Sequence, residues 1–314
     1  MLITNYKGWK SYARFFSAEH CQAYLKNNYK KCNNDNPEQK GYENCYAFLY
    51  YLEHGQIYYQ QAENAPLILK PILLFYGLVH LIKACILTVD PDYPETTSVL
   101  AHGVSTRKRK KQNYQFFQDE VKFQRNGLFP FMSEKMFNMK QLEGDKITME
   151  ELLELIPELD DLFTVHESKS TFTPIYTQNE QLIVPDKLMD HYHMTEDRLK
   201  EFLTTKSRNH IEFSNEGLTF QLNKSSFTGI SPIKINLESS SYVLPHKKDN
   251  LCLFPELMVH YLLLYNLSMI ARYETEWWGE LTKMMPNRDY PFIKSFLDIT
   301  LKKGPFLVYE YLME

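Results

Sequence analysis

The sequence predicts an α+β fold in which helices predominate and strands are confined to the middle of the chain. Long apolar segments with helical spacing lie in both terminal parts, whereas alternation of apolar and polar residues occurs only between them. The turn signals Asn126-Gly127 and Asn215-Glu216-Gly217 also lie in this middle part. With 314 residues, the chain is long enough to bury a core without disulfides or metal ions.

The first elements are predicted from helix caps and breakers. Ser17 is the expected N-cap of a first helix, and residues 33–37 (NNDNP) are expected to form a loop. Residues 42–61 then predict an aromatic-rich helix, with Gly55 as its weak point.

The most apolar segment, residues 66–89, predicts a long helix that begins at Pro66 and ends before Asp90. Its longest run without a formal charge, residues 71–82, has only 12 residues. Such a run is too short to cross about 30 Å of hydrocarbon. The segment is therefore expected to be a buried helix rather than a membrane span.

The middle of the chain predicts two hairpins, two short helices and further extended segments. In chain order these are a hairpin from 113–123 to 128–132, an acidic helix at 148–162, an extended segment at 171–184, a helix at 195–203 with Thr195 as N-cap, a hairpin at 209–223 and a strand at 233–244.

The C-terminal part returns to helix. A long apolar helix is expected at 254–273, followed by shorter ones at 275–285, 291–302 and 305–313. The apolar helices at 66–89 and 254–273 are expected to pack against each other, because neither terminal part alone has enough helix to cover them. We therefore expect a discontinuous helical bundle domain built from residues 1–103 and 247–314, with residues 104–246 as an inserted α/β region.

Composition argues against several classes of protein. A net charge of −4 and a pI near 6.2 argue against a generally cationic nucleic-acid-binding surface. The basic run Arg107–Lys111 is an exception that could contact nucleic acid or an acidic protein, although a solvated loop is the simpler interpretation. The five cysteines show no CxxC or CxxH spacing, which argues against zinc knuckles and disulfide frameworks and favours reduced thiols.

The N-terminus lacks the apolar stretch of a signal peptide, so a cytoplasmic location away from membranes is expected. No glycine-rich nucleotide loop, nucleophile elbow or kinase signature occurs. The sequence accordingly predicts no cofactor, no metal site and no catalytic residue.

Two polar stripes stand out on the long apolar helices. Tyr76, His80 and Lys83 follow i, i+4, i+7 spacing and share one face of the first helix. A second stripe, on the C-terminal helix, consists of Tyr261, Tyr265, Ser268 and Arg272.

If the two helices pack together, their stripes could form one polar cleft, with His102 close by. Lys83 and Arg272 would then suit phosphate, a nucleotide or RNA backbone. The predicted ligand-binding residues are Tyr76, His80, Lys83, His102, Tyr265, Ser268 and Arg272. The alternatives are that Lys83 extends to solvent, that His80 is a core residue, and that Arg272 pairs with a nearby acid.

Several segments together resemble one bacterial family. They are residues 66–87 (PLILKPILLFYGLVHLIKACIL), His102-Gly103, residues 126–130 (NGLFP) and residues 265–278 (YNLSMIARYETEWW). They resemble the YaaC-like proteins of Firmicutes over essentially the whole chain. The resemblance implies IMP dehydrogenase, a purine-pathway enzyme, as a partner.

The helical pattern also resembles, distantly, the HEPN bundle shared by ribonucleases and nucleotide-binding proteins. HEPN nucleases carry a histidine four to six residues after an arginine. Arg272 is followed at those positions by Glu276, Trp277 and Trp278. That motif is therefore missing from this helix.

These observations favour a non-enzymatic binding or regulatory protein that binds a nucleotide, another phosphate-bearing ligand or a purine-pathway enzyme. One alternative is a HEPN-like ribonuclease or other phosphoester-cleaving enzyme, with His80 or His102 as acid or base. Another is an interaction protein of phage defence or stress response. RNA remains a weaker possibility as a partner.

Overall fold

A computed structural model describes the chain at residues 5–106, 114–140, 143–178, 181–207, 211–214, 217–222, 231–251, 253–285 and 287–314. It forms two compact units. The helical unit comprises residues 6–152 and 260–313. The small unit comprises residues 153–259 together with the described terminal residues Asn5 and Glu314. The predicted division at 103/104 and 246/247 stays a prediction.

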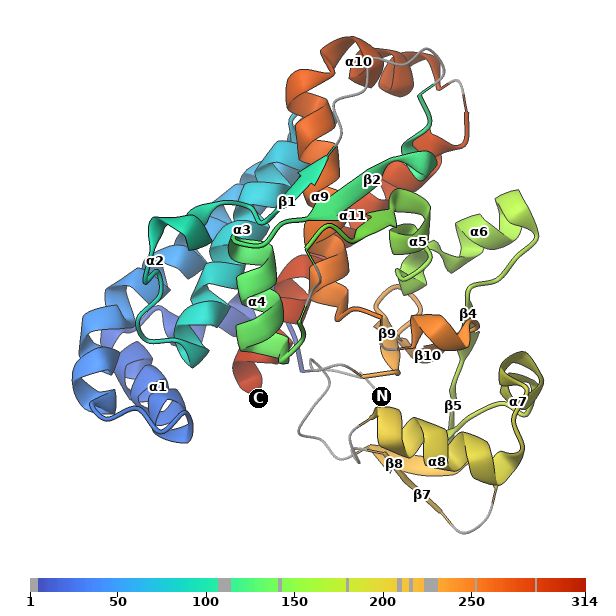
Figure 1. Cartoon of the computed structure of the whole chain (residues 1–314), viewed down its shortest axis with the longest axis horizontal. Coiled ribbons are helices and arrows are strands. Elements are labelled where there is room, and N and C mark those ends of the chain that lie inside the picture. The colour runs from blue at the N-terminus through green and yellow to red at the C-terminus, as the bar shows by residue number, and fades with distance from the viewer. Residues whose placement is uncertain are drawn as a thin grey trace. The chain divides into compact units, whose positions relative to one another are not determined.

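The fold is α+β and predominantly helical, as predicted (Figure 1). Its α-helices are α1 (Ala18–Lys31), α2 (Pro37–Glu63), α3 (Lys70–Val89), α4 (Leu128–Phe137), α5 (Met149–Leu153), α6 (Asp160–Glu167), α7 (Lys187–Tyr192), α8 (Glu196–Lys206), α9 (Glu256–Tyr273), α10 (Thr275–Met284) and α11 (Asp289–Met313). Short 3-10 helices are η1 (Lys10–Phe15), η2 (Thr97–Leu100), η3 (Phe116–Gln118), η4 (Pro157–Leu159) and η5 (Lys248–Asn250).

The strands form three small antiparallel sheets within the described residues. The helical unit contains β1 (Val104–Thr106), β2 (Glu120–Phe123) and β3 (Lys146–Thr148) in the order β1-β2-β3. The small unit contains one sheet of order β4-β10-β9, with β4 (Phe172–Pro174), β9 (Lys234–Asn236) and β10 (Ser241–Pro245). Its second sheet has the order β5-β6-β8-β7, with β5 (Tyr176–Gln178), β6 (Gln181–Ile183), β7 (Ile211–Phe213) and β8 (Thr219–Leu222).

The first predicted helix boundaries are largely confirmed. Ser17 caps α1 through its side chain, which accepts a hydrogen bond from the His20 amide at 3.4 Å. The loop ends before Pro37, the first residue of α2, so this helix begins five residues earlier than the predicted residue 42. The start of the apolar helix was wrong by four residues, since α3 begins at Lys70 rather than Pro66.

Close packing of α2 against α3 gives Gly55 a role that the sequence did not reveal. A Cβ atom at Gly55 would lie 2.5 Å from the Leu81 side chain. On the opposite helix, a Cβ at Gly77 would lie 2.8 Å from the ring of Tyr59. Both positions therefore need glycine, and the lower helix propensity is offset by the close approach of the two helices.

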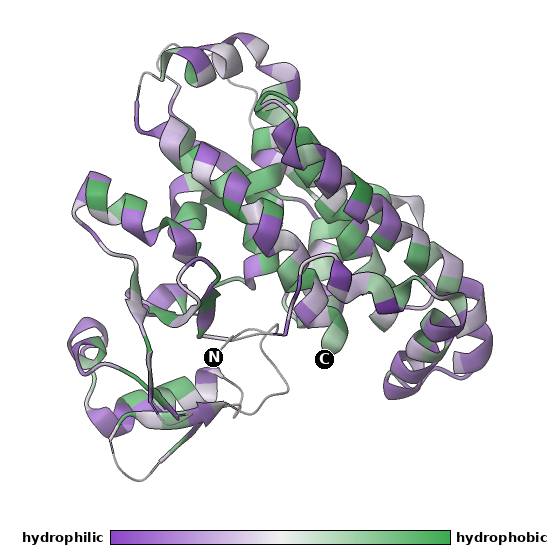
Figure 2. Ribbon diagram, turned by 180° about the vertical axis from the view of Figure 1, so that it is seen from behind, coloured by the Kyte–Doolittle hydropathy of each residue, from purple (hydrophilic) through white to green (hydrophobic). Residues whose placement is uncertain are grey.

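α3 has the length and apolar composition of a membrane-spanning helix, the one such helix in the described part of the chain. However, 67% of its most apolar window is buried inside the protein. Its side chains pack between α2, α11 and α9, and Phe75 is fully buried against Tyr261 and Tyr265. α3 thus occupies the core of the helical unit. In Figure 2 the surrounding helices carry alternating hydrophilic and hydrophobic bands, as amphipathic helices do.

The hairpin predicted from 113–123 to 128–132 is wrong. β2 pairs with β1 and β3, whereas residues 128–137 form α4. The run LFPFM buries Leu128, Phe129 and Met132 at i, i+1, i+4 spacing, which suits a helix. Gly127 begins this helix instead of closing a two-residue hairpin.

Two other predicted elements differ in extent. The acidic segment 148–162 is not one helix but α5, η4 and α6, because Pro157 interrupts it. The last two predicted helices are one, α11, with Pro305 inside it. The Pro305 carbonyl accepts a hydrogen bond from the buried Tyr12 hydroxyl at 2.6 Å, which helps to hold this turn in place.

The small unit confirms most of its predicted elements. Residues 171–184 contain three short strands, and α8 follows Thr195. β7 and β8 form the predicted antiparallel pair, although Asn215 and Glu216 of the turn lie outside the described residues. The single strand predicted at 233–244 is two strands, β9 and β10, which pair with each other.

Candidate functional site

α3 and α9 bring the two predicted polar stripes together at Arg272. The Tyr76 hydroxyl accepts a hydrogen bond from Nη1 of Arg272 at 3.1 Å. The guanidinium carbon lies 5.8 Å from the ring centroid of Tyr76 and 5.2 Å from that of Tyr273. Because arginine stays protonated, this arrangement fixes a positive charge between two aromatic rings.

Arg272 is held by its own helix rather than by an acid. Its Nε donates to the Ser268 carbonyl at 3.1 Å, and Nη2 donates to the Met269 sulfur at 3.1 Å. Among the described residues it forms no ion pair with a carboxylate, neither with Glu274 nor with Glu276. Three of the five guanidinium N–H groups are thus used, which leaves one on each terminal nitrogen for an anion.

His102 lies beside this arginine, surrounded by aromatic rings. Its ring centroid is 5.1 Å from Phe75, 6.4 Å from Tyr76 and 5.5 Å from Tyr265. The His102 carbonyl accepts a hydrogen bond from the Tyr261 hydroxyl at 2.8 Å. Tyr261 therefore ties the segment after η2 to α9.

A contact between two glycines holds the backbone at His102. Gly103 and Gly127 have φ angles of +77° and +128°, and a Cβ at Gly127 would lie 2.3 Å from the Gly103 nitrogen. Next to this contact, the Leu128 amide donates to the Ala101 carbonyl at 2.7 Å. The His-Gly and Asn-Gly pairs are needed here because any side chain would separate the two segments.

The other end of the α3 stripe packs against α2. Nζ of Lys83 lies 5.7 Å from the ring centroid of Tyr51. The His80 ring stacks on Tyr58 at 5.6 Å with an interplanar angle of 20°, and it meets His54 edge-on at 5.2 Å. In the described part of the chain, Lys83 forms no ion pair with a carboxylate.

Tyr51, His54 and Tyr58 were not among the predicted site residues. Their i, i+3, i+7 spacing places them on one face of α2, so a pattern was present in the sequence. We define the cation–aromatic cluster as the group of partly exposed side chains at this surface of the helical unit: Tyr51, His54, Tyr58, Tyr76, His80, Lys83, His102 and Arg272.

Burial and neighbouring positive charge both disfavour further protonation in the cluster. Burial, then Lys83 and His54, lowers the pKa of His80 from 6.5 to about 4. Burial, then Arg272 and Lys83, also lowers the pKa of His102. Burial alone lowers the pKa of the Lys83 ammonium. A bound anion would oppose each of these effects, because it stabilises the protonated forms.

Two predicted site residues have other roles in the structure. The Ser268 hydroxyl is fully buried and donates to the Tyr265 carbonyl of its own helix at 2.8 Å. Tyr265 is nearly buried, and burial raises the pKa of its hydroxyl. Tyr265 therefore contributes a packing surface for His102, and Ser268 contributes its backbone carbonyl to Arg272.

Three other features considered in the sequence are the basic run, metal-binding groups and the cysteines. The basic run Arg107–Lys111 lies outside the described residues. Among the residues that are described, no group of three or more histidine, cysteine, aspartate or glutamate side chains is placed to hold a metal ion. Four of the five cysteines, Cys21, Cys32, Cys45 and Cys85, are free thiols, and Cys252 is outside the described part.

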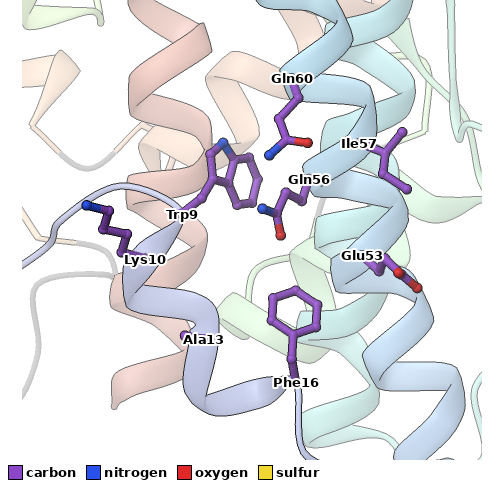
Figure 3. A pocket seen from close by; sticks show the side chains of 8 residues that line it. All are labelled: Trp9, Lys10, Ala13, Phe16, Glu53, Gln56, Ile57 and Gln60. Atoms are coloured by element: carbon purple, nitrogen blue, oxygen red, sulfur yellow. The ribbon is translucent and has the colours of Figure 1, made fainter.

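A groove of about 520 Å³ lies elsewhere in the helical unit, between η1 and α2. Its walls are Trp9, Lys10, Ala13, Phe16, Glu53, Gln56, Ile57 and Gln60. In Figure 3 the Trp9 and Gln56 side chains point toward one another, whereas Lys10 and Ile57 point away. The groove combines aromatic and amide groups but contains no cluster of cations, so it suits a phosphate-bearing ligand less well than the cation–aromatic cluster does.

One comparison with known proteins gave a match. The model of the family described as YaaC-like Protein matches residues 13–312, nearly the whole chain. Searches of curated proteins and of solved structures found no match.

Proposed function

The chain belongs to the YaaC-like protein family, and we propose that it acts as a non-enzymatic binding protein whose cation–aromatic cluster holds a phosphate-bearing ligand such as a nucleotide. The observation that carries this proposal is the lack of carboxylate partners for Arg272 and Lys83 within the described residues. Partly buried cations without acids are costly, and an anionic ligand relieves that cost.

The cluster also provides directional groups for such a ligand. Arg272 offers two N–H groups in a fork that fits phosphate oxygens. The surrounding rings of Tyr76 and Tyr58 are partly exposed and could stack on a base. The purine-pathway partner implied by the family resemblance and the cytoplasmic location expected from the sequence stay predictions.

A binding experiment on one variant tests the proposal. Calorimetric titration with AMP, GMP and ATP, and with inorganic phosphate, should detect binding to the wild-type protein. Arg272→Ala should weaken it at least about 30-fold, the lower end of what truncating a desolvated charged contact costs. Arg198→Ala changes an exposed arginine of α8 and should leave affinity unchanged.

The result that would overturn the proposal is intact binding in Arg272→Ala with a lowered melting temperature. Arg272 would then be a structural residue. The ribonuclease alternative is tested with the same proteins: RNA cleavage by the wild type that disappears in Arg272→Ala would replace a binding function with an enzymatic one.

A further inference from the structure

Aromatic rings form a continuous row between the two cations of the cluster. The contacts run from Arg272 to Tyr76 at 5.8 Å, Tyr76 to Tyr58 at 6.3 Å, Tyr58 to His80 at 5.6 Å, His80 to Tyr51 at 6.0 Å, and Tyr51 to Lys83 at 5.7 Å. We define the aromatic row as Tyr76, Tyr58, His80 and Tyr51.

The row follows the axis of the helix pair. Tyr58 lies opposite Tyr76, and Tyr51 lies near Lys83, so α2 and α3 run antiparallel here. Tyr76 and Lys83 are seven residues apart on α3, which corresponds to about 10 Å along the helix axis. The cations therefore mark two ends of an elongated surface rather than one point.

The rings along the row are inclined to their neighbours by small angles. These interplanar angles are 33° for Tyr58 with Tyr76, 20° for Tyr58 with His80, and 38° for Tyr51 with His80. All four side chains are partly exposed. Exposed aromatic side chains beside cations are the elements by which proteins bind unpaired bases and their phosphates.

We propose that the cation–aromatic cluster binds a short single strand of nucleic acid, with phosphates at Arg272 and Lys83 and bases against the aromatic row. The outer phosphates of a 5′-phosphorylated trinucleotide are two steps apart, about 7 Å when the strand is stacked at 3.4 Å per nucleotide and more when it is extended, so a strand of this length can reach across the distance of about 10 Å. A mononucleotide monophosphate has one phosphate and can satisfy one cation only. This inference rests on the proposed function and narrows its ligand from a nucleotide to a strand.

The experiment compares a trinucleotide (pApApA, and its deoxy form) with AMP by titration calorimetry. The trinucleotide should bind at least about tenfold more tightly than AMP. Lys83→Met should reduce the affinity for the trinucleotide to about that for AMP, whereas Lys83→Arg should retain trinucleotide binding. Arg272→Ala should weaken both ligands.

A stacking variant and salt dependence sharpen the test. Tyr58→Leu should weaken trinucleotide binding by about fivefold or more, as loss of a base–aromatic contact does. Tyr46→Leu is the matched control, because Tyr46 is also on α2, is 52% exposed and lies outside the cluster. The slope of log K against log salt should be about −1.4 for two phosphates and should become about −0.7 in Lys83→Met.

The outcomes separate the two proposals. Equal affinities for AMP and the trinucleotide, with Lys83→Met unchanged, would overturn the strand proposal and leave the proposed function standing. Failure of phosphate, AMP and trinucleotide alike to bind would overturn both. Weaker trinucleotide binding in Tyr46→Leu than in Tyr58→Leu would also overturn the assignment of the aromatic row.

Discussion

Two charged sites of the protein, Glu154 in the small unit and the cation–aromatic cluster in the helical unit, differ in how their charges are paired. In the small unit, the buried carboxylate of Glu154 accepts hydrogen bonds from Lys169 at 2.6 Å and from Lys247 at 2.5 Å. In the helical unit, Arg272 and Lys83 are partly buried and, within the described residues, have no carboxylate beside them. Paired charges stabilise a fold locally, whereas unpaired ones keep their capacity to bind a ligand.

The pKa directions follow the same contrast. Burial raises the pKa of Glu154, but the hydrogen bonds from Lys169 and Lys247 outweigh it and leave that pKa below its ordinary value of 4.5. For His80 and His102 every cause acts in one direction, toward the neutral imidazole. The buried charge of Glu154 is balanced by its two lysine partners, whereas the charges of the cation–aromatic cluster have no carboxylate partner within the described residues.

The largest effect is expected from the glycine that holds the backbone at His102. Gly127→Ala should lower the free energy of unfolding by about 3–5 kcal/mol, because the backbone conformation favours glycine and the added methyl group meets Gly103. Gly217 of the small unit also has a positive φ, of +61°, but nothing lies near its Cβ position. Gly217→Ala should therefore cost only about 1 kcal/mol. Urea denaturation measures both, and equal losses would contradict the glycine contact.

Substituting one charged residue in each unit should produce an intermediate difference in the free energy of unfolding. Glu154→Gln should cost about 1–2 kcal/mol, less than for a fully buried pair, because the Lys169 and Lys247 side chains are 43% and 51% exposed. Lys83→Met in the helical unit should leave stability unchanged or increase it. Thermal unfolding of both variants measures the difference, and a larger loss in Lys83→Met would refute the contrast.

In the wild-type protein, lowering the pH should also remove the stabilisation that ionised Glu154 provides. Its folded-state pKa is below 4.5, so the stabilisation is present above 4.5 and is lost as pH falls through the folded-state value. Glu154→Gln should lose less stability than the wild type over this acidic range.

Protonation of His80 should cause a smaller loss of stability, and over a different pH range, than protonation of Glu154. Its folded-state pKa of about 4 lies below the ordinary 6.5, so the unfolded chain binds more protons between these values. Stability should fall as pH falls from 6.5 to 4, by about 1 kcal/mol after allowance for the half-exposed side chain. His80→Gln should flatten this part of the curve, and parallel curves for the two proteins would show that His80 titrates normally.

Sequence periodicity was sufficient to place residues on helix faces. The 3.6-residue repeat predicted that Tyr76, His80 and Lys83 share one face, and the same repeat aligned Tyr265 with Arg272. The apolar character of both helices then predicted that they pack together, and the hydrogen bond between Tyr76 and Arg272 joins them.

Contacts between distant segments could not be inferred in this way. The interpretation of Asn126-Gly127 as a hairpin failed because Gly127 is fixed by Gly103, which a local pattern cannot reveal. Pro305 was taken as the start of a helix, although its buried neighbours keep α11 continuous. The contribution of α2 to the site was not predicted. Its aromatic face can be assigned to the site only when α3 is known to be its neighbour.

Substitution of Ser268 should have the smallest effect on stability and binding. This residue also shows that a shared helix face does not by itself make a side chain part of the site. It shares the stripe of Arg272, yet its hydroxyl donates to the Tyr265 carbonyl within α9. That carbonyl belongs to a helix and has a backbone partner one turn ahead, so removing the hydroxyl leaves no orphaned group. Ser268→Ala should therefore change stability by less than about 0.5 kcal/mol and phosphate-ligand affinity by less than about twofold.

Ser268→Ala tests whether Ser268 differs from Arg272 in contributing to ligand binding. Both residues lie on one face of α9, but only the Arg272 side chain presents N–H groups that its own helix leaves unused. Titration of Ser268→Ala and Arg272→Ala with the same nucleotide compares them directly. A tenfold loss in Ser268→Ala would mean that the hydroxyl rotates away from Tyr265 to meet the ligand. The binding surface would then extend along α9, toward the N-terminal side of Arg272, rather than along α2 and α3.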